Sequence, residues 1–200
     1  MEDAKIHVIN LNVKETVEDL KILQVRIGKE IQRMLEKQLN DLVNEIVKDN
    51  HQKIGLLEDN ELEELKSESD KRLKEAVEKI KSKVIDNSIW PDLSSIQDGI
   101  STQEIEKINE ISIPAFTDFI AEVDEMAGYV AAPFSDHGFN ISRLKINKNG
   151  KYSQSMTFIP TIEITQGFAE YNERFMVLKD LLNQQLSIQE NKTRRDALDK

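Results

Sequence analysis

The uneven placement of aromatic and proline residues constrains the fold of this 200-residue chain more than any other feature. Every aromatic side chain lies between Trp90 and Phe175, and all four prolines lie between Pro91 and Pro160. Aromatic side chains bury large areas in protein cores, and proline interrupts helices. The first 89 residues contain neither type, so we expect long helices there and a compact core in the later part of the chain.

Apolar residues recur along residues 14–50 with the spacing of one helix face. The stripe alternates between steps of four and three residues, which indicates an amphipathic helix with a coiled-coil-like seam. Its members are Val13, Val17, Leu20, Gln24, Ile27, Ile31 and Met34, followed by Leu35, Leu39, Leu42 and Ile46. A polar break and a second, thinner apolar stripe follow. Because a narrow apolar face buries little alone, we predict that the two helices pack as an antiparallel hairpin, a helical arm over residues 14–86.

Two features predict how this arm is oriented. Ile22 and Val25 lie opposite the main stripe, which predicts that this stretch is buried on two sides and roots the arm in the rest of the protein. Residues 58–75 carry one thin stripe and are expected to project away. Three apolar residues lie at the expected tip: Ile54, Leu56 and Leu57. They either seal the end of the hairpin or form an exposed contact with a partner or with lipid.

Residues 1–13 together with 87–190 are predicted to form a compact α+β head. The expected elements are a short strand within 4–13, helices near 101–108 and 114–130, a strand at 161–164, a last helix from Gly167 and a polar tail over 191–200. The predicted fold class is therefore mainly α (α+β), with a long antiparallel helical hairpin attached to a small helical head that carries a β-hairpin.

The β-hairpin is expected within residues 141–158. Asn149-Gly150 marks a tight turn, and a three-residue loop over 148–150 sorts apolar and polar side chains onto separate faces. A two-residue loop would mix them. In the sorted register the hairpin presents a basic, hydroxyl-rich outer face. Its basic residues are Arg143, Lys145, Lys148 and Lys151.

The charge of the chain limits the partners that this basic face can have. The net charge of −10 and the pI of about 4.9 argue against nucleic-acid or anionic-membrane binding over the whole surface. An acidic block over residues 87–136 precedes the basic one. Three interpretations stay open for the basic face: contact with nucleic-acid phosphates, contact with an acidic protein or a second copy of the chain, and solubility.

Few residues are suited to catalysis or to metal and cofactor binding. The chain has no cysteine and only three histidines. Ser135, Asp136 and His137 are consecutive, so their side chains point in different directions and cannot form a catalytic relay. No phosphate-binding glycine loop, dinucleotide fingerprint or histidine pair with zinc-ligand spacing is present. We therefore expect no enzyme activity, no cofactor and no metal site.

These observations predict a non-enzymatic assembly or adaptor subunit that binds a protein partner or itself through the helical arm and the charged patches. The first alternative is an accessory subunit of a nucleic-acid-handling complex that uses the basic hairpin. A second is a helical toxin or membrane-active module, which the lack of a long apolar run disfavours. No signal peptide is visible, so a cytoplasmic location is the default expectation.

Overall fold

The structure is a computed structural model that describes residues 5–6, 9–85, 90–96, 99–111, 116–141, 144–146, 152–154 and 161–199. The protein is mainly helical, as the sequence predicts. The helices are α1 (Leu11–Asp49), α2 (His51–Ile54), α3 (Glu61–Ile85), α4 (Thr102–Glu110), α5 (Phe116–Asp136) and α6 (Ile162–Leu198). The strands are β1 (Lys5–Ile6), β2 (Ile100–Ser101), β3 (Leu144–Ile146) and β4 (Tyr152–Gln154). In this described part, no helix is long and apolar enough to cross a membrane.

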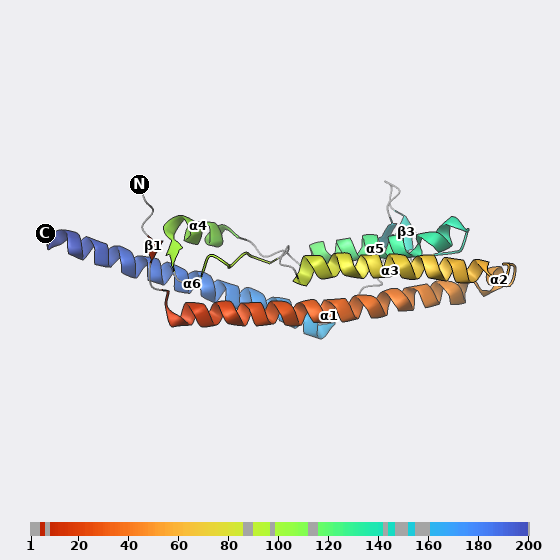
Figure 1. Ribbon diagram of the computed structural model, residues 1–200, viewed down its shortest axis with the longest axis horizontal. Helices are drawn as coiled ribbons and strands as arrows, with labels where there is room; N and C mark the ends of the chain where they lie inside the picture. Colours follow the sequence, from red (N-terminus) through yellow and green to blue (C-terminus); the bar gives the residue numbers. More distant parts are fainter. Residues whose placement is uncertain are drawn as a thin grey trace.

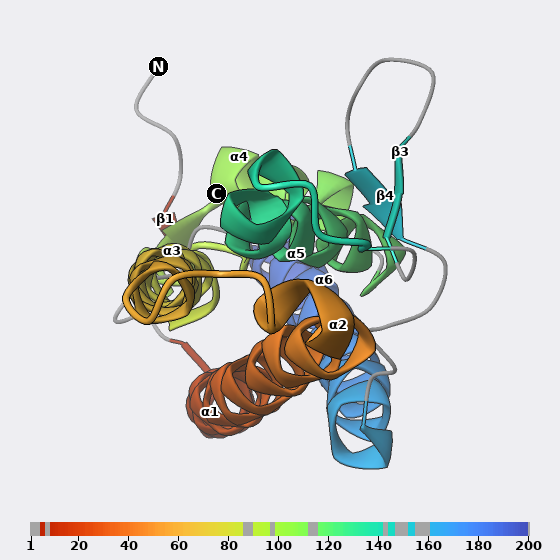
Figure 2. The same cartoon turned by 90° about the vertical axis from the view of Figure 1, so that its right-hand side faces the viewer.

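The helices form an elongated rod with α1 along one side (Figure 1). At one end, α3 runs back along the C-terminal half of α1, and α5 lies against α3 (Figures 1 and 2). At the other end, α6 runs antiparallel along the N-terminal half of α1. Two ion pairs mark this direction: Asp19 pairs with Arg174 at 2.5 Å and Arg26 with Glu170 at 2.7 Å. The two halves of the rod therefore share α1.

The apolar stripe of α1 forms the centre of the core. All of its predicted apolar members are buried, which confirms the amphipathic helix. The prediction of a second buried face is wrong, because Ile22 is 66% exposed and Val25 is 45% exposed. The buried residues of this stretch, Leu20, Leu23 and Ile27, lie on one side of the helix, opposite to Ile22 and Val25.

α5 covers α3, so residues 58–75 do not project away as a bare hairpin. The hydroxyl of Ser69 is buried and donates a hydrogen bond to the carbonyl oxygen of Val130 at 2.8 Å. Ala76 and Val77 are both buried although they are consecutive, so the buried face of α3 is wide enough to meet two neighbours. The helix packs against α1 and α5 at once, which explains how its thin apolar stripe is covered.

Pro133, which lies inside α5, creates a second contact with α3. Proline has no N–H, so the carbonyl four residues earlier, that of Tyr129, lacks its usual helical donor. The Arg72 guanidinium donates a hydrogen bond to this carbonyl at 3.2 Å and lies 4.9 Å from the centre of the Tyr129 ring. A side chain of α3 thereby satisfies a backbone group that α5 leaves without a donor.

α5 ends in a tight turn at Gly138, whose φ of 74° is in the left-handed region that favours glycine. The N–H of Gly138 donates to the carbonyl of Ser135 at 2.8 Å, and the N–H of Phe139 donates to the carbonyl of Phe134 at 2.9 Å. This is the Schellman pattern of helix termination. The Phe134 and Phe139 rings meet edge to face at 5.4 Å, so the turn also closes an apolar contact.

The other half of the rod has an aromatic core. Trp90 stacks on Phe168 with 5.5 Å between ring centres and lies 4.5 Å from the Tyr171 ring. The Tyr171 ring stacks on Phe175 at 6.4 Å, one helical turn further along α6. Every member of this group is buried, which agrees with the prediction that the aromatic residues mark a core.

One expectation about the last third of the chain is wrong. The strand expected at 161–164 is the first turn of α6, which begins before the predicted start at Gly167. The Thr161 hydroxyl accepts a hydrogen bond from the N–H of Ile164 at 3.3 Å and caps the helix. At the other end, α6 stays helical to Leu198, so the described part of the polar tail extends the helix.

The strands form two short antiparallel pairs. β1 pairs with β2, so residues near the start of the chain lie beside the beginning of α4. β3 pairs with β4, with Ile146 opposite Tyr152 and Lys145 opposite Ser153. β4 packs against α5, which places this pair on the half of the rod that contains α3.

Candidate partner-binding site

The end of the rod where α1 turns back into α3 carries the three apolar residues selected from the sequence. Ile54 and Leu57 are half-buried and pack against the core. Leu56 lies between them in sequence and is 86% exposed. The turn is short and hydrogen-bonded, with the N–H of Leu56 donating to the carbonyl of Lys53 at 3.0 Å. Two apolar side chains therefore anchor this tip, and the third faces solvent.

Asn50 fixes the tip to the end of α5. Its side-chain amide donates to the carbonyl of Ile46 at 2.7 Å and to the carbonyl of Asn140 at 2.8 Å. Its side-chain oxygen accepts from the backbone N–H of Asn140 at 2.7 Å. Asn50 is buried, and Lys53 lies over the Phe139 ring at 5.5 Å. The tip is thus held on two sides.

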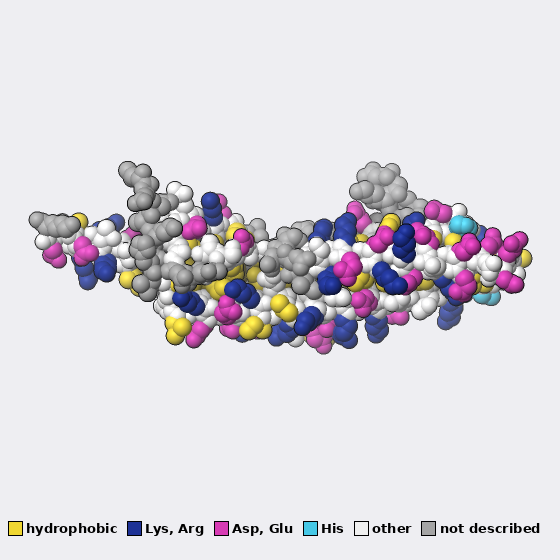
Figure 3. Space-filling view, viewed as in Figure 1, with side chains coloured by type: hydrophobic (Ala, Val, Ile, Leu, Met, Phe, Trp, Pro, Cys, Tyr) yellow, Lys and Arg dark blue, Asp and Glu magenta, His cyan; other side chains and the backbone are white. Residues whose placement is uncertain are grey.

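Several acidic residues lie close to Leu56 in the sequence. The end of the rod that carries α2 is rich in Asp and Glu (Figure 3). The exposed acidic residues that follow Leu56 most closely are Glu58, Asp59, Glu61, Glu63 and Glu64. Three of these stand in the first turn of α3, where negative charge favours the helix dipole. The Glu61 carboxylate also accepts a hydrogen bond from the backbone N–H of Glu58 at 2.9 Å. They therefore stabilise the start of α3 and give the tip a negative field.

The four basic residues of the predicted β-hairpin stay a prediction. Lys145 lies in β3, and the structure describes its backbone pairing only. Arg143, Lys148 and Lys151 lie outside the described residues.

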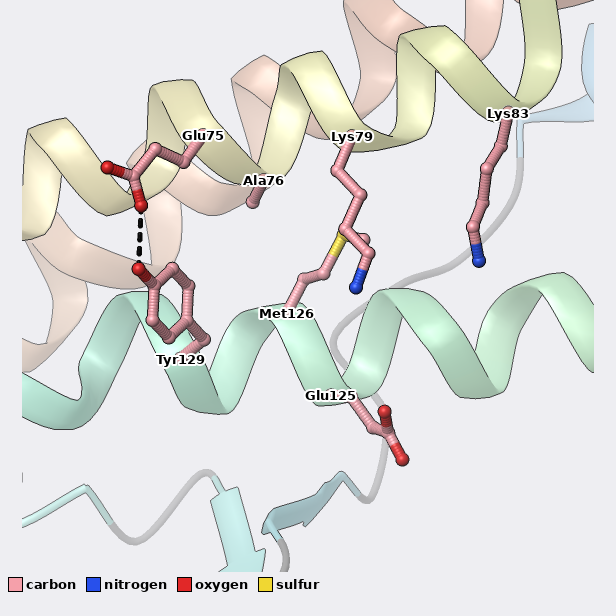
Figure 4. Close-up of a pocket in the computed structure, with 7 residues that line it drawn as sticks. All are labelled: Glu75, Ala76, Lys79, Lys83, Glu125, Met126 and Tyr129. Atoms are coloured by element: carbon pink, nitrogen blue, oxygen red, sulfur yellow. Dashed lines mark hydrogen bonds between the residues drawn. The ribbon is translucent and has the colours of Figure 1, made fainter.

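A groove between α3 and α5 is a feature that sequence reasoning missed. Its volume is about 570 Å³, and Figure 4 shows six of its side chains along the cavity. These are Glu75, Ala76, Lys79 and Lys83 of α3, with Met126 and Tyr129 of α5. The sequence pattern suggests an ion pair between Glu75 and Lys79, four residues apart. In the structure, the Tyr129 hydroxyl donates instead to the Glu75 carboxylate at 2.6 Å.

The same hydrogen bond perturbs Tyr129. The Glu75 carboxylate accepts from the neutral phenol, which raises the pKa of Tyr129 above its usual value of 10.0, with a smaller contribution from burial. The Tyr129 side chain is 44% exposed and stands at one end of the groove. Tyr129 thus joins α5 to α3 through its hydroxyl, its ring and its backbone carbonyl.

The structure places the three consecutive residues of the Ser-Asp-His segment at the end of α5. Ser135, Asp136 and His137 close the last turn of α5, and the His137 ring lies 3.0 Å from the carbonyl of Pro133 through Nδ1. Within the described ranges, no group of three or more His, Asp or Glu side chains could hold a metal ion.

Comparison with protein-family models, with curated proteins and with solved structures gives no match to this chain. The function must therefore be argued from the residues themselves. Two residues that make the contacts described above stand out in the sequence, although the sequence does not show which residues they contact. Asn50 stands at the polar break between α1 and α2, and Pro133 interrupts an otherwise helical stretch.

Proposed function

We propose that this protein is a non-enzymatic assembly or adaptor subunit, and that the tip of the rod binds a protein partner. The observation that carries the proposal is the 86% exposure of Leu56 on a tip whose neighbours are packed and hydrogen-bonded. A rigid site loses little conformational entropy on binding, so a single apolar side chain can contribute more to affinity there than on a flexible loop.

The surroundings of Leu56 favour one class of partner surface. Acidic side chains flank the leucine, so a complementary surface has an apolar pocket rimmed by Lys and Arg. An apolar contact at the centre and a polar rim around it are the usual anatomy of a protein–protein interface. The rod shape supports an assembly role, because it holds the tip far from the opposite end of α6 (Figure 1).

The test compares Leu56→Asp with Ile22→Asp in the full chain. Ile22 is 66% exposed on the other half of the rod, so it controls for loss of an exposed apolar side chain. A photoreactive residue at position 56 identifies the cross-linked partner in the native host. Calorimetry with the purified partner then gives the affinities, and light scattering gives the mass when the partner is a second copy.

We expect Leu56→Asp to weaken binding by more than about tenfold, since burying a leucine contributes ~1.5–3 kcal/mol. Ile22→Asp should bind as the wild type does. Equal affinities of all three proteins, or no cross-link from position 56, would remove the tip as the binding site.

A further inference from the structure

The C-terminal end of α6 projects from the rod as an exposed helix. Figure 1 shows it extending past the start of α1 and past α4, and all residues over 187–199 are exposed. A helix of about 12 residues that stands alone is marginal in water. We propose that this end of α6 pairs antiparallel with the same segment of a second copy of the chain. It lies at the opposite end of the rod from Leu56, so the inference does not depend on the partner-binding tip.

An exposed stripe with coiled-coil spacing runs along this part of α6. Its members alternate between steps of four and three residues, as in a helix that pairs with another helix along a narrow seam. Val177 is 50% exposed, Ile188 is 69% exposed and Leu198 is 85% exposed. The stripe begins beside the rest of the rod and continues along the projecting end. Its members are Val177, Leu181, Gln184, Ile188, Asn191, Arg195 and Leu198.

In the part of the chain that the structure describes, the stripe lies between the two sides of α6 that contact other elements. On one side, Lys179 donates to the carbonyl of Ile111, the residue after α4, at 2.8 Å. On the other side, the side-chain oxygen of Gln185 accepts from the backbone N–H of Asn10, which caps α1, at 3.3 Å. A shallow hollow on the exposed side offers room for the side chains of a second helix. It is lined by Asp180, Asn183, Gln184, Ser187 and Ile188.

The charge of the projecting end favours a second copy as its partner. Residues 187–199 contain three basic and three acidic side chains, so their net charge is zero, whereas the whole chain carries −10. Two copies therefore repel each other over much of their surface, and contact between them is least opposed where the local charge cancels. A nucleic acid or a strongly basic protein would find no complementary field at this segment.

The stripe is self-complementary in the antiparallel direction. When Gln184 of one copy lies opposite Arg195 of the second copy, Leu181 lies opposite Leu198. The two-fold symmetry of the pair repeats both contacts, so a pair of leucines closes each end of the seam. In a parallel pair, Arg195 would lie beside Arg195 of the second copy, and the two like charges would repel each other.

The first test measures the mass of the full chain by light scattering and sedimentation equilibrium. Because the seam contains few apolar pairs, we expect a monomer–dimer equilibrium with a Kd of about 10–100 µM. Ile188→Asp should raise this Kd by more than about tenfold, since one substitution removes an apolar side chain from both copies. Met176→Asp is the matched control, because Met176 is 56% exposed on the same helix but lies off the stripe. Leu56→Asp should also leave the mass unchanged, which distinguishes this surface from the tip.

The second test determines the direction of pairing by disulfide cross-linking. The chain has no cysteine, so single introduced cysteines report without background. Gln184→Cys and Arg195→Cys proteins, one of them with an affinity tag, are mixed and mildly oxidised, and we expect a mixed disulfide. Thr193→Cys is the control, because residue 193 is two positions from 195 but lies on the opposite side of the helix. All three positions are exposed, so the substitutions remove no core contact.

Three results would overturn the proposal. The first is a monomeric mass at every concentration up to about 1 mM. The second is a dimer of Ile188→Asp that is as tight as that of the wild type. The third is a disulfide that joins two Arg195→Cys chains, or Gln184→Cys to Thr193→Cys, more readily than Gln184→Cys to Arg195→Cys. Circular dichroism and thermal melting show whether each variant is folded.

Discussion

Removing the Arg72 side chain tests how α5 is attached to α3. Arg72 donates to the Tyr129 carbonyl that Pro133 leaves without a helical donor, and its guanidinium lies over the Tyr129 ring. If this account is right, the effect of Arg72→Ala depends on whether residue 133 is a proline. In Pro133→Ala, the new backbone N–H can donate to the same carbonyl, so Arg72 becomes partly redundant.

The magnitude follows from the two contacts of Arg72 with Tyr129. Arg72 also pairs with Glu68 on its own helix at 3.1 Å, which adds only a few tenths of a kcal/mol and adds the same amount in both backgrounds. A hydrogen bond from a charged donor contributes about 1.5–3 kcal/mol, and a cation–π contact at a partly exposed site contributes about 0.5–1 kcal/mol. The Arg72 side chain is 24% exposed, so we take the lower part of each range and expect Arg72→Ala to cost about 2 kcal/mol. In the Pro133→Ala background the cost should fall to about 1 kcal/mol, because the carbonyl is no longer left without a donor.

The assay is a double-mutant cycle of wild type, Arg72→Ala, Pro133→Ala and the double variant. Urea unfolding followed by circular dichroism and by Trp90 fluorescence gives the free energy of unfolding, and agreement of the two probes checks two-state behaviour. Pro133 is buried, so its replacement changes packing as well as hydrogen bonding. The interaction energy of the cycle removes that contribution.

The control is Arg26→Ala. Arg26 pairs with Glu170 at 2.7 Å, but the two side chains are 60% and 38% exposed, so its loss should cost less than about 1 kcal/mol. It lies on the other half of the rod and should show no coupling to Pro133→Ala. Equal costs of Arg72→Ala in both backgrounds would refute the argument that Arg72 replaces the missing helical donor.

Three further outcomes are expected. Asn50→Ala should lower the free energy of unfolding by about 2–3 kcal/mol in urea titrations, since it removes two partly buried hydrogen bonds to the chain after α5. Gly167→Ala should lower it by about 1–3 kcal/mol, because the added Cβ would lie 2.7 Å from Cγ1 of Ile27 where α6 meets α1. The raised pKa of Tyr129 means that its contribution to stability is complete below pH 10.0 and is lost as the pH rises further. Glu75→Gln should lower that pKa, which tyrosinate absorbance measures, and an unchanged titration would contradict the role of the carboxylate.

The structural features that depend on local sequence patterns can be predicted from the sequence. The stripe of α1 can be identified because helix periodicity places its members on one face, and all the apolar ones are buried. Ser101 and Glu104 form the capping box that their spacing predicts, with both reciprocal hydrogen bonds present. The pairing of Ile146 with Tyr152 is the one that sorting by polarity favours.

What the sequence does not reveal depends on contacts between distant elements. Ile22 and Val25 are apolar, and nothing local says that no helix covers their side of α1. Polar and apolar residues alternate over 161–164 as they do in a strand. The segment is helical because the Thr161 hydroxyl caps the helix and Ile164 is buried in the core. A pattern records which residues prefer burial, and only the tertiary arrangement decides which of them are covered.

The packing of α5 on α3 brings these arguments together, because it changes what residues 58–75 can do. A bare hairpin that projects away would leave the outer side of residues 58–75 open to a partner along its whole length. Since α5 covers α3 through Ser69, Arg72 and Tyr129, that side is not open in the described part of the chain. The argument for a partner then narrows to the exposed Leu56 at the tip.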